Sequence, residues 1–228
     1  MKPEKKTDAT RRSRGFFQVS GLRVQVSTLP WLCLAVALAA LVIQLAPAWR
    51  GALLYDRAGV AAGGLWRLWT GHLVHFGWPH FVVDTGLLLI VGWFAEQRHP
   101  AFTRWGLLLM PLFISGCLFW LEPGLLRYGG LSAVNLGLLV YVAAQGWRRD
   151  WTDWFWPAVL LLYVAELIFE HQRGGQGGGA IRFDDPGIRV ATGAHLASAA
   201  YALLALGVAR CRTTFNTQPT TSNIHPGK

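Results

Sequence analysis

The chain has 228 residues, of which 53% are hydrophobic and only 14% are charged, with 12 tryptophans and a net charge of +9. A composition this apolar excludes a water-soluble domain and indicates a membrane protein. The positive charge does not indicate nucleic-acid binding, because the basic residues lie between apolar runs and in the amino-terminal tail.

Six apolar runs without sustained charge follow one another along the chain. They cover residues 30–49, 72–95, 102–121, 131–146, 153–169 and 190–209. Most have about the 20 residues that a transmembrane helix needs, and the connections between them are rich in Gly, Pro and charge. The sequence therefore predicts an all-α, polytopic membrane protein with one six-transmembrane-helix bundle.

The runs also predict the domain organisation and the orientation. Residues 1–28 form a basic tail, 29–211 the membrane domain and 212–228 a second tail. With both termini in the cytoplasm, most of the 21 Lys and Arg residues fall on the cytoplasmic side, as positively charged loops do. Ala46-Pro47-Ala48 fits a signal-peptide cleavage site, but the first run is longer than a signal-peptide core, which favours an uncleaved span.

The fourth run is short, since 16 residues from 131 to 146 reach roughly 24 Å, less than the roughly 30 Å hydrocarbon core. A short helix among longer ones leaves room for a water-filled depression above its end. Irregular backbone such as Tyr128-Gly129-Gly130 is tolerated at membrane depth only where it lines such a cavity. Ser132 stands at this end.

Ser132 and His195 are predicted to meet in the bundle. Small residues line one face of each of their helices: Gly130, Ala133 and Gly137 on the fourth run, and Ala191, Ser198, Ala199 and Ala202 on the sixth. Such faces let two helix backbones approach closely. A serine within hydrogen-bond reach of a histidine is a minimal nucleophilic unit that needs no acid, so Ser132 is the candidate nucleophile and His195 its base.

Acyl transfer also needs hydrogen-bond donors for the developing oxyanion. The Ser132 N–H and His80 are candidates, and Asp84 lies one helical turn after His80. An ionised Asp84 would repel the oxyanion. Asp84 is therefore expected either to be protonated and to donate a hydrogen bond, or to form an ion pair that positions His80.

A metal site formed by His72, His75, His80 and Asp84 is the main alternative use of these residues. No HExxH motif or second histidine cluster completes such a site, and the three cysteines show no zinc-site spacing. Neither a metal nor another cofactor is expected. His72 and His75 are instead expected to bond loop backbone, and Arg67 to brace the loop after the first run.

Four short motifs resemble those of the rhomboid family of intramembrane serine proteases, over residues 66–206. The family's Trp-Arg, His-x-x-x-Asn, Gly-x-Ser-Gly and Ala-His-x-x-Gly motifs correspond to Trp66-Arg67, His80-Phe81-Val82-Val83-Asp84, Gly130-Leu131-Ser132-Ala133 and Ala194-His195-Leu196-Ala197-Ser198. The resemblance implies a six-helix rhomboid-like bundle with Ser132 and His195 as catalytic dyad. It implies that His80, Asp84 and Gly130 support the oxyanion site.

Finer features resemble the rhombosortase branch of the family: Gly71-His72-Leu73-Val74-His75, Trp78-Pro79-His80, Tyr128-Gly129-Gly130-Leu131-Ser132 and Phe169-Glu170-His171-Gln172. This resemblance implies a protease of the bacterial inner membrane, in contact with membrane lipid. Its substrates would be surface proteins with a carboxy-terminal Gly-Gly motif followed by a transmembrane helix and a basic tail.

Three positions depart from the family motifs: Asp84 replaces Asn, and Ala133 and Ser198 replace Gly. Ala and Ser are small enough to keep the close packing, whereas Asp84 introduces charge. These departures leave an alternative open, in which the chain is a catalytically impaired rhomboid-like pseudoprotease that binds transmembrane segments without cutting them.

Overall fold

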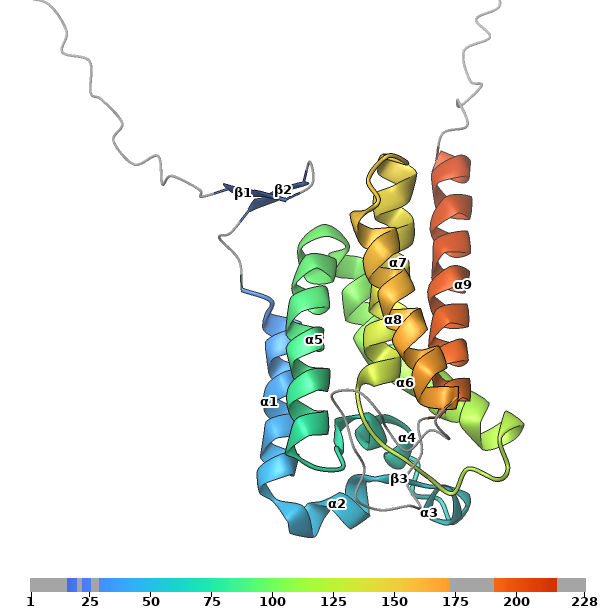
Figure 1. Ribbon diagram of the computed structural model, residues 1–228. Helices are drawn as coiled ribbons and strands as arrows, with labels where there is room; N and C mark the ends of the chain where they lie inside the picture. The colour runs from blue at the N-terminus through green and yellow to red at the C-terminus, as the bar shows by residue number, and fades with distance from the viewer. Residues whose placement is uncertain (1–15, 20–21, 26–28, 173–190, 217–228) are drawn as a thin grey trace, which may run out of the picture.

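A computed structural model of the chain describes residues 16–19, 22–25, 29–172 and 191–216. The long helices form a bundle (Figure 1). They are α1 (Trp31–Leu45), α5 (Trp78–Arg98), α6 (Pro100–Leu121), α7 (Ser132–Arg149), α8 (Phe155–Gln172) and α9 (Thr192–Asn216). The first turn of α1 and the last turns of α9 point toward the same end of the bundle (Figure 1).

The long helices coincide with the six apolar runs, which confirms the all-α membrane architecture. By length and apolar composition, α5, α6 and α9 are able to cross a membrane. A fourth span results if α1 and α2 (Pro47–Leu53), which meet at a bend of 115°, are taken together. The carboxy-terminal end of α7 carries Arg148 and Arg149, so that helix is less apolar. The count of six spans remains a prediction.

The second helix begins later than the sequence indicates. Residues 72–77 were expected to be part of it, but α5 starts at Trp78, with Gly77 at a φ of 110° and Pro79 in the first turn. Proline is tolerated in the first turn because its missing N–H would have no partner there. His72 and His75 therefore lie in a buried segment that precedes the helix, of which Gly71–Leu73 is a 3-10 turn, η1.

The segment between α1 and α5 is folded rather than a plain connection. It contains α2, β3 (Tyr55–Asp56), α3 (Arg57–Ala61) and α4 (Arg67–Thr70), gathered at one end of the bundle (Figure 1). Arg67 Nη1 donates hydrogen bonds of 2.8 Å to the carbonyls of Gly51 and Leu54. The expected bracing role of Arg67 thus matches its contacts.

Two short antiparallel strand pairs accompany the helices. In the amino-terminal tail, β1 (Phe16–Val19) pairs with β2 (Leu22–Gln25). In the membrane domain, β3 pairs with β4 (Arg127–Tyr128). The second pair ties the segment before α5 to the two glycines that precede α7, and thereby fixes the backbone at Ser132.

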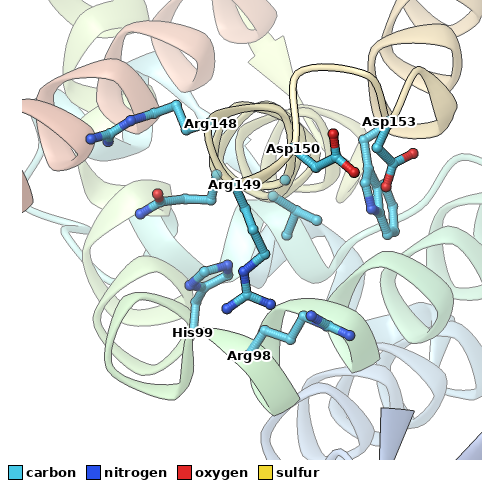
Figure 2. A pocket seen from close by; sticks show the side chains of 10 residues that line it. Arg98, His99, Arg148, Arg149, Asp150 and Asp153 are labelled. Atoms are coloured by element: carbon cyan, nitrogen blue, oxygen red, sulfur yellow. The ribbon is translucent and has the colours of Figure 1, made fainter. Parts of the chain in front are cut away.

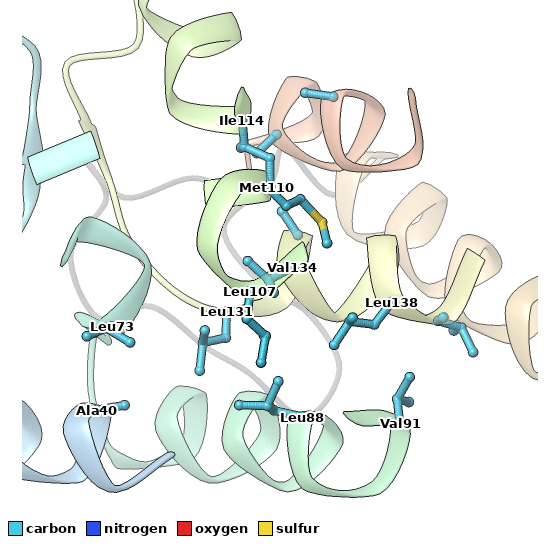
Figure 3. Close-up of a cluster of buried hydrophobic side chains, with 14 of the residues drawn as sticks. Ala40, Leu73, Leu88, Val91, Leu107, Met110, Ile114, Leu131, Val134 and Leu138 are labelled. Carbon is cyan, nitrogen blue, oxygen red and sulfur yellow. The ribbon is translucent and has the colours of Figure 1, made fainter. Parts of the chain in front are cut away.

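Helix α7 lies in the core of the bundle, and almost all of its residues from Ala133 to Ala143 are buried. Figure 3 shows Val134 and Leu138 of this helix, and Leu131 directly before it, among apolar side chains of α5 and α6. Its most extensive packing is against α9. A Cβ at Gly137 would lie 3.2 Å from the Ser198 carbonyl oxygen, so the predicted close approach of the two small faces is confirmed.

The fourth apolar run does form a helix, but it is not shorter than all the others. Helix α7 has 18 residues, against 21, 22 and 25 in α5, α6 and α9, but α8 also has 18 and α1 has 15. Its first residue is Ser132. At 1.5 Å per residue it spans roughly 27 Å, which places Ser132 and Arg149 at opposite ends of the bundle.

Candidate active site

Ser132 is held at the start of α7 by an unusual backbone. Gly130 has a φ of 112°, which L side chains rarely adopt. A Cβ at this position would lie 2.6 Å from His80 Nε2 and 2.9 Å from Asp84 Oδ2. Only glycine therefore fits here without displacing the two side chains that contact the start of the helix.

Ser132 and His195 come together as the sequence indicated. His195 Nε2 lies 3.1 Å from Ser132 Oγ. His195 is buried in the first turns of α9, whereas Ser132 is only half-buried. Within the described residues no carboxylate forms an ion pair with His195. The two side chains are in hydrogen-bond contact, and in the tautomer with a bare Nε2 the serine hydroxyl is the donor.

One carboxylate oxygen of Asp84 lies next to the backbone of this serine. Asp84 Oδ2 accepts hydrogen bonds from the N–H of Leu131 at 2.7 Å and from the N–H of Ser132 at 3.1 Å. His80 Nε2 and His75 Nε2 lie 3.2 Å and 3.3 Å from the same oxygen. The carboxylate is buried at the amino-terminal end of α7, where the helix dipole favours negative charge.

The contacts of His75 and His80 indicate which of their ring nitrogens carry a proton. His80 Nδ1 accepts from the Phe76 N–H at 3.3 Å, so the proton of a neutral His80 is on Nε2 and points to Asp84. His75 Nδ1 lies 3.1 Å from the Leu73 carbonyl oxygen, which can only accept. His75 Nδ1 therefore carries a proton, while His75 Nε2 lies 3.3 Å from Asp84 Oδ2 without a hydrogen bond to it.

This arrangement bears on the two roles expected for Asp84. Because Oδ2 accepts from both backbone amides, it does not donate to the position beside Ser132. The contacts fit better the alternative in which Asp84 orients His80, but through a hydrogen bond from a neutral His80 and not an ion pair, with His75 also beside the carboxylate. His80 directs its Nε2 at Asp84 and not at an open oxyanion position.

Asp84, His75, His80 and the backbone amides of Leu131 and Ser132 form what we call the Asp84 cluster. Side chains of neighbouring helices hydrogen-bond to the backbone of this cluster. Asn135 Nδ2 donates to the Asp84 carbonyl at 2.9 Å, and the Tyr163 hydroxyl of α8 donates to the Ser132 carbonyl at 2.9 Å. Ser198 Oγ donates to the His195 carbonyl at 2.8 Å, so this departure from the family motif is accommodated by the backbone of its own helix.

Burial, and next the negative charge of Asp84, raise the pKa of the Tyr128 hydroxyl, which therefore stays protonated.

His75 and Tyr163 were not identified as site residues from the sequence. His75 was expected only to bond loop backbone, which it does through Leu73, but it also contacts Asp84. Its position five residues before His80, with Gly77 between them, was the available signal. No pattern in the sequence pointed to Tyr163, because its contact with Ser132 depends on how α8 packs against α7.

His72 does not join the cluster. Its Nε2 lies 3.1 Å from the Pro111 carbonyl oxygen and 3.1 Å from Ser115 Oγ, both on α6. In the part of the chain that the structure describes, no group of three or more His, Cys, Asp or Glu side chains is arranged to hold a metal ion. The alternative of a metal site that includes His72 is therefore not supported.

Comparison with known proteins gives one family. The Rhomboid domain family matches residues 62–212, which is more than half of the chain. The matched segment contains the Ser132–His195 pair and the Asp84 cluster, while α1 and α2 precede it. No curated protein matches the chain.

Proposed function

The chain is an integral membrane protein that belongs to the rhomboid family, and we propose that it is an intramembrane serine endopeptidase with Ser132 as nucleophile and His195 as general base. The observation that carries this proposal is the 3.1 Å contact between His195 Nε2 and Ser132 Oγ at the start of α7. That distance is within the range in which a histidine can take a hydroxyl proton.

The dyad accounts for both halves of the reaction. His195 takes the Ser132 proton as Oγ attacks the carbonyl carbon of the scissile peptide, and then gives this proton to the departing amine. The acyl group remains on Oγ until a water molecule, deprotonated by His195, attacks it and frees the serine. His195 then returns the proton to Ser132 Oγ, which restores the resting dyad.

The donors available to an oxyanion are the backbone N–H groups of Leu131 and Ser132, together with His80. All three face Asp84 Oδ2, so the carboxylate oxygen stands where an oxyanion would be stabilised. We propose that a bound substrate carbonyl displaces this oxygen and takes over its hydrogen bonds. Loss of a single oxyanion donor costs an enzyme roughly 10²–10³ in rate, so the resting protein is expected to be a slow enzyme.

The substrate class follows from the rhombosortase-like motifs. Residues of three of these motifs pack near one another, although His72 lies outside the Asp84 cluster: the rings of His72 and Tyr128 are 5.1 Å apart, and those of His75 and His80 are also 5.1 Å apart. We propose that the substrate is a membrane protein with a carboxy-terminal Gly-Gly motif before its transmembrane helix. Glycines let an extended backbone approach Ser132 closely, and the proposed location is the bacterial inner membrane.

A second candidate function rests on the same carboxylate. If Asp84 is never displaced, the donors beside Ser132 stay occupied and the protein binds transmembrane segments without cutting them. Such a pseudoprotease would keep the fold and the dyad contact. It differs from a slow protease only in turnover.

Co-expression with a Gly-Gly-tailed membrane substrate separates the two. A protease releases the substrate from the membrane fraction with wild-type enzyme but not with Ser132→Ala, and it fails to release a substrate whose two glycines are replaced by valine. A pseudoprotease gives the same intact substrate with wild-type and Ser132→Ala protein, while both copurify with it.

A further inference from the structure

A cavity of about 760 Å³ lies at the end of the bundle opposite Ser132 (Figure 2). Its walls come from the end of α5, the start of α6, the end of α7 and the linker to α8. Arg149 extends toward Arg98 and His99, whereas Arg148 extends away from them, and Asp150 and Asp153 lie on the linker side. None of these residues takes part in the proposed chemistry at Ser132.

The charges in this cavity favour an anion. Three arginines line it, and within the described residues neither Arg148 nor Arg149 forms an ion pair. One oxygen of each carboxylate is engaged in a local turn, since Asp150 Oδ1 accepts from the Thr152 N–H and hydroxyl and Asp153 Oδ1 accepts from the Phe155 N–H. The two carboxylates stay negative, so the three arginines leave an excess of one positive charge in the lining. Burial, and then the positive charges of Arg98 and Arg149, lower the pKa of His99, which is therefore a neutral donor at pH 7.

The surroundings of the cavity indicate the depth of a lipid headgroup. Three exposed tryptophans gather on the same part of the chain, Trp147, Trp151 and Trp154, and the rings of Trp147 and Trp154 are 5.5 Å apart. Tryptophan is enriched where a membrane protein crosses from hydrocarbon to headgroups. The next aromatic residue, Phe155, is also exposed, so apolar surface for acyl chains adjoins the basic opening.

We propose that this cavity binds the phosphate of an anionic phospholipid headgroup, with Arg98 and Arg149 as its main ligands. A guanidinium presents a planar pair of N–H groups that matches phosphate oxygens. Two such groups from different helices, with His99 beside them, offer more donors than one open arginine at the membrane surface. A lipid bound here connects α5, α6 and α7 at the end remote from the candidate active site.

Native mass spectrometry of the full-length protein, titrated with dioleoyl phosphatidylglycerol in detergent, tests this site. An arginine near an anionic lipid contributes about fivefold in affinity, so Arg98→Gln and Arg149→Gln are each expected to weaken lipid retention about fivefold, and the double variant about 25-fold. Arg104→Gln is the matched control, because Arg104 is exposed near the start of α6 but does not line the cavity; it should change retention less than twofold.

Further measurements identify the ligand and guard against misfolding. Phosphatidylcholine should be retained far less than phosphatidylglycerol, and inorganic phosphate should not displace the bound lipid. Arg149→Lys keeps the charge but loses the paired donors, so it should fold normally and still weaken retention. Three results would each overturn the proposal. Arg104→Gln could weaken phosphatidylglycerol retention as much as the double variant does. Phosphatidylcholine could be retained as well as phosphatidylglycerol, or inorganic phosphate could displace the bound lipid.

Discussion

The backbone N–H of Ser132 donates a hydrogen bond to Asp84 Oδ2 at 3.1 Å, so the candidate nucleophile is linked directly to the carboxylate that occupies its oxyanion donors. The same oxygen is also contacted by the Leu131 N–H, His75 and His80. The substitution expected to raise the rate is therefore at Asp84, because the contact between Ser132 and His195 is already formed.

Asp84→Asn is expected to raise kcat/KM on a Gly-Gly-tailed substrate by tenfold or more. The amide has no charge to repel an oxyanion, and its Nδ2 adds a donor, which is worth roughly 10²–10³ in rate when it is fully used. Asp56→Asn is the control, because Asp56 caps α3 through the Gly59 N–H and Asn caps a helix as well as Asp does. Equal or lower activity in Asp84→Asn would contradict displacement of the carboxylate.

His75→Gln is expected to destabilise the fold because it removes a buried ring that lies 3.3 Å from the Asp84 carboxylate. Leaving a buried polar group with fewer partners costs about 1–3 kcal/mol. Combining it with Asp84→Asn removes the charge of the carboxylate, so the double variant should be more stable than His75→Gln alone. Thermal unfolding in detergent measures this, and strictly additive effects in the double-mutant cycle would show that the two side chains are not coupled.

Gly130→Ala is expected to lower activity by 100-fold or more, since the new Cβ would lie 2.6 Å from His80 Nε2 on a backbone with φ of 112°. Gly86→Ala is the comparison on α5, where a Cβ meets nothing within 4 Å, and it should leave activity unchanged. Initial cleavage rates at matched protein levels report both. A similar loss in the two variants would point to a general effect of alanine on the bundle instead of the predicted clash.

Cysteine labelling tests the predicted orientation. In a Cys33→Ala, Cys117→Ala background, Cys211 near the end of α9 should be shielded from a membrane-impermeant maleimide in intact cells. Leu126→Cys, at an exposed position between α6 and α7, should react. The opposite pattern would place Ser132 at the cytoplasmic face and remove an externally exposed Gly-Gly-tailed protein as substrate.

Much of the architecture could be predicted because it depends on local patterns. Apolar runs define the long helices, and the small residues around Gly137 and Ser198 predict which two helices pack closely enough to join Ser132 to His195. The proline at position 79 could have placed the start of α5, but the apolar run continued through His72 and His75 and concealed it. Each of these predictions depends only on residues that are close together in the sequence.

The Asp84 cluster and the basic cavity could not be predicted in this way. Asp84 and His80 share a helical face, but the contact of Asp84 with the Leu131 and Ser132 amides depends on the turn at Gly130. His75 reaches the same oxygen only because the segment before α5 folds back. Arg98 and Arg149 are 51 positions apart in the sequence and face one cavity only after α5 and α7 have packed.

The dyad is tested most directly by peptide mass spectrometry of the full-length protein after exposure to a fluorophosphonate, with the adduct mapped and its rate of formation measured. The account predicts a single adduct on Ser132, formed at least 100-fold more slowly in His195→Ala and at an unchanged rate in Ser198→Ala, which removes a hydroxyl that serves only the His195 carbonyl. An adduct on another residue, or equal rates in wild-type and His195→Ala protein, would contradict it.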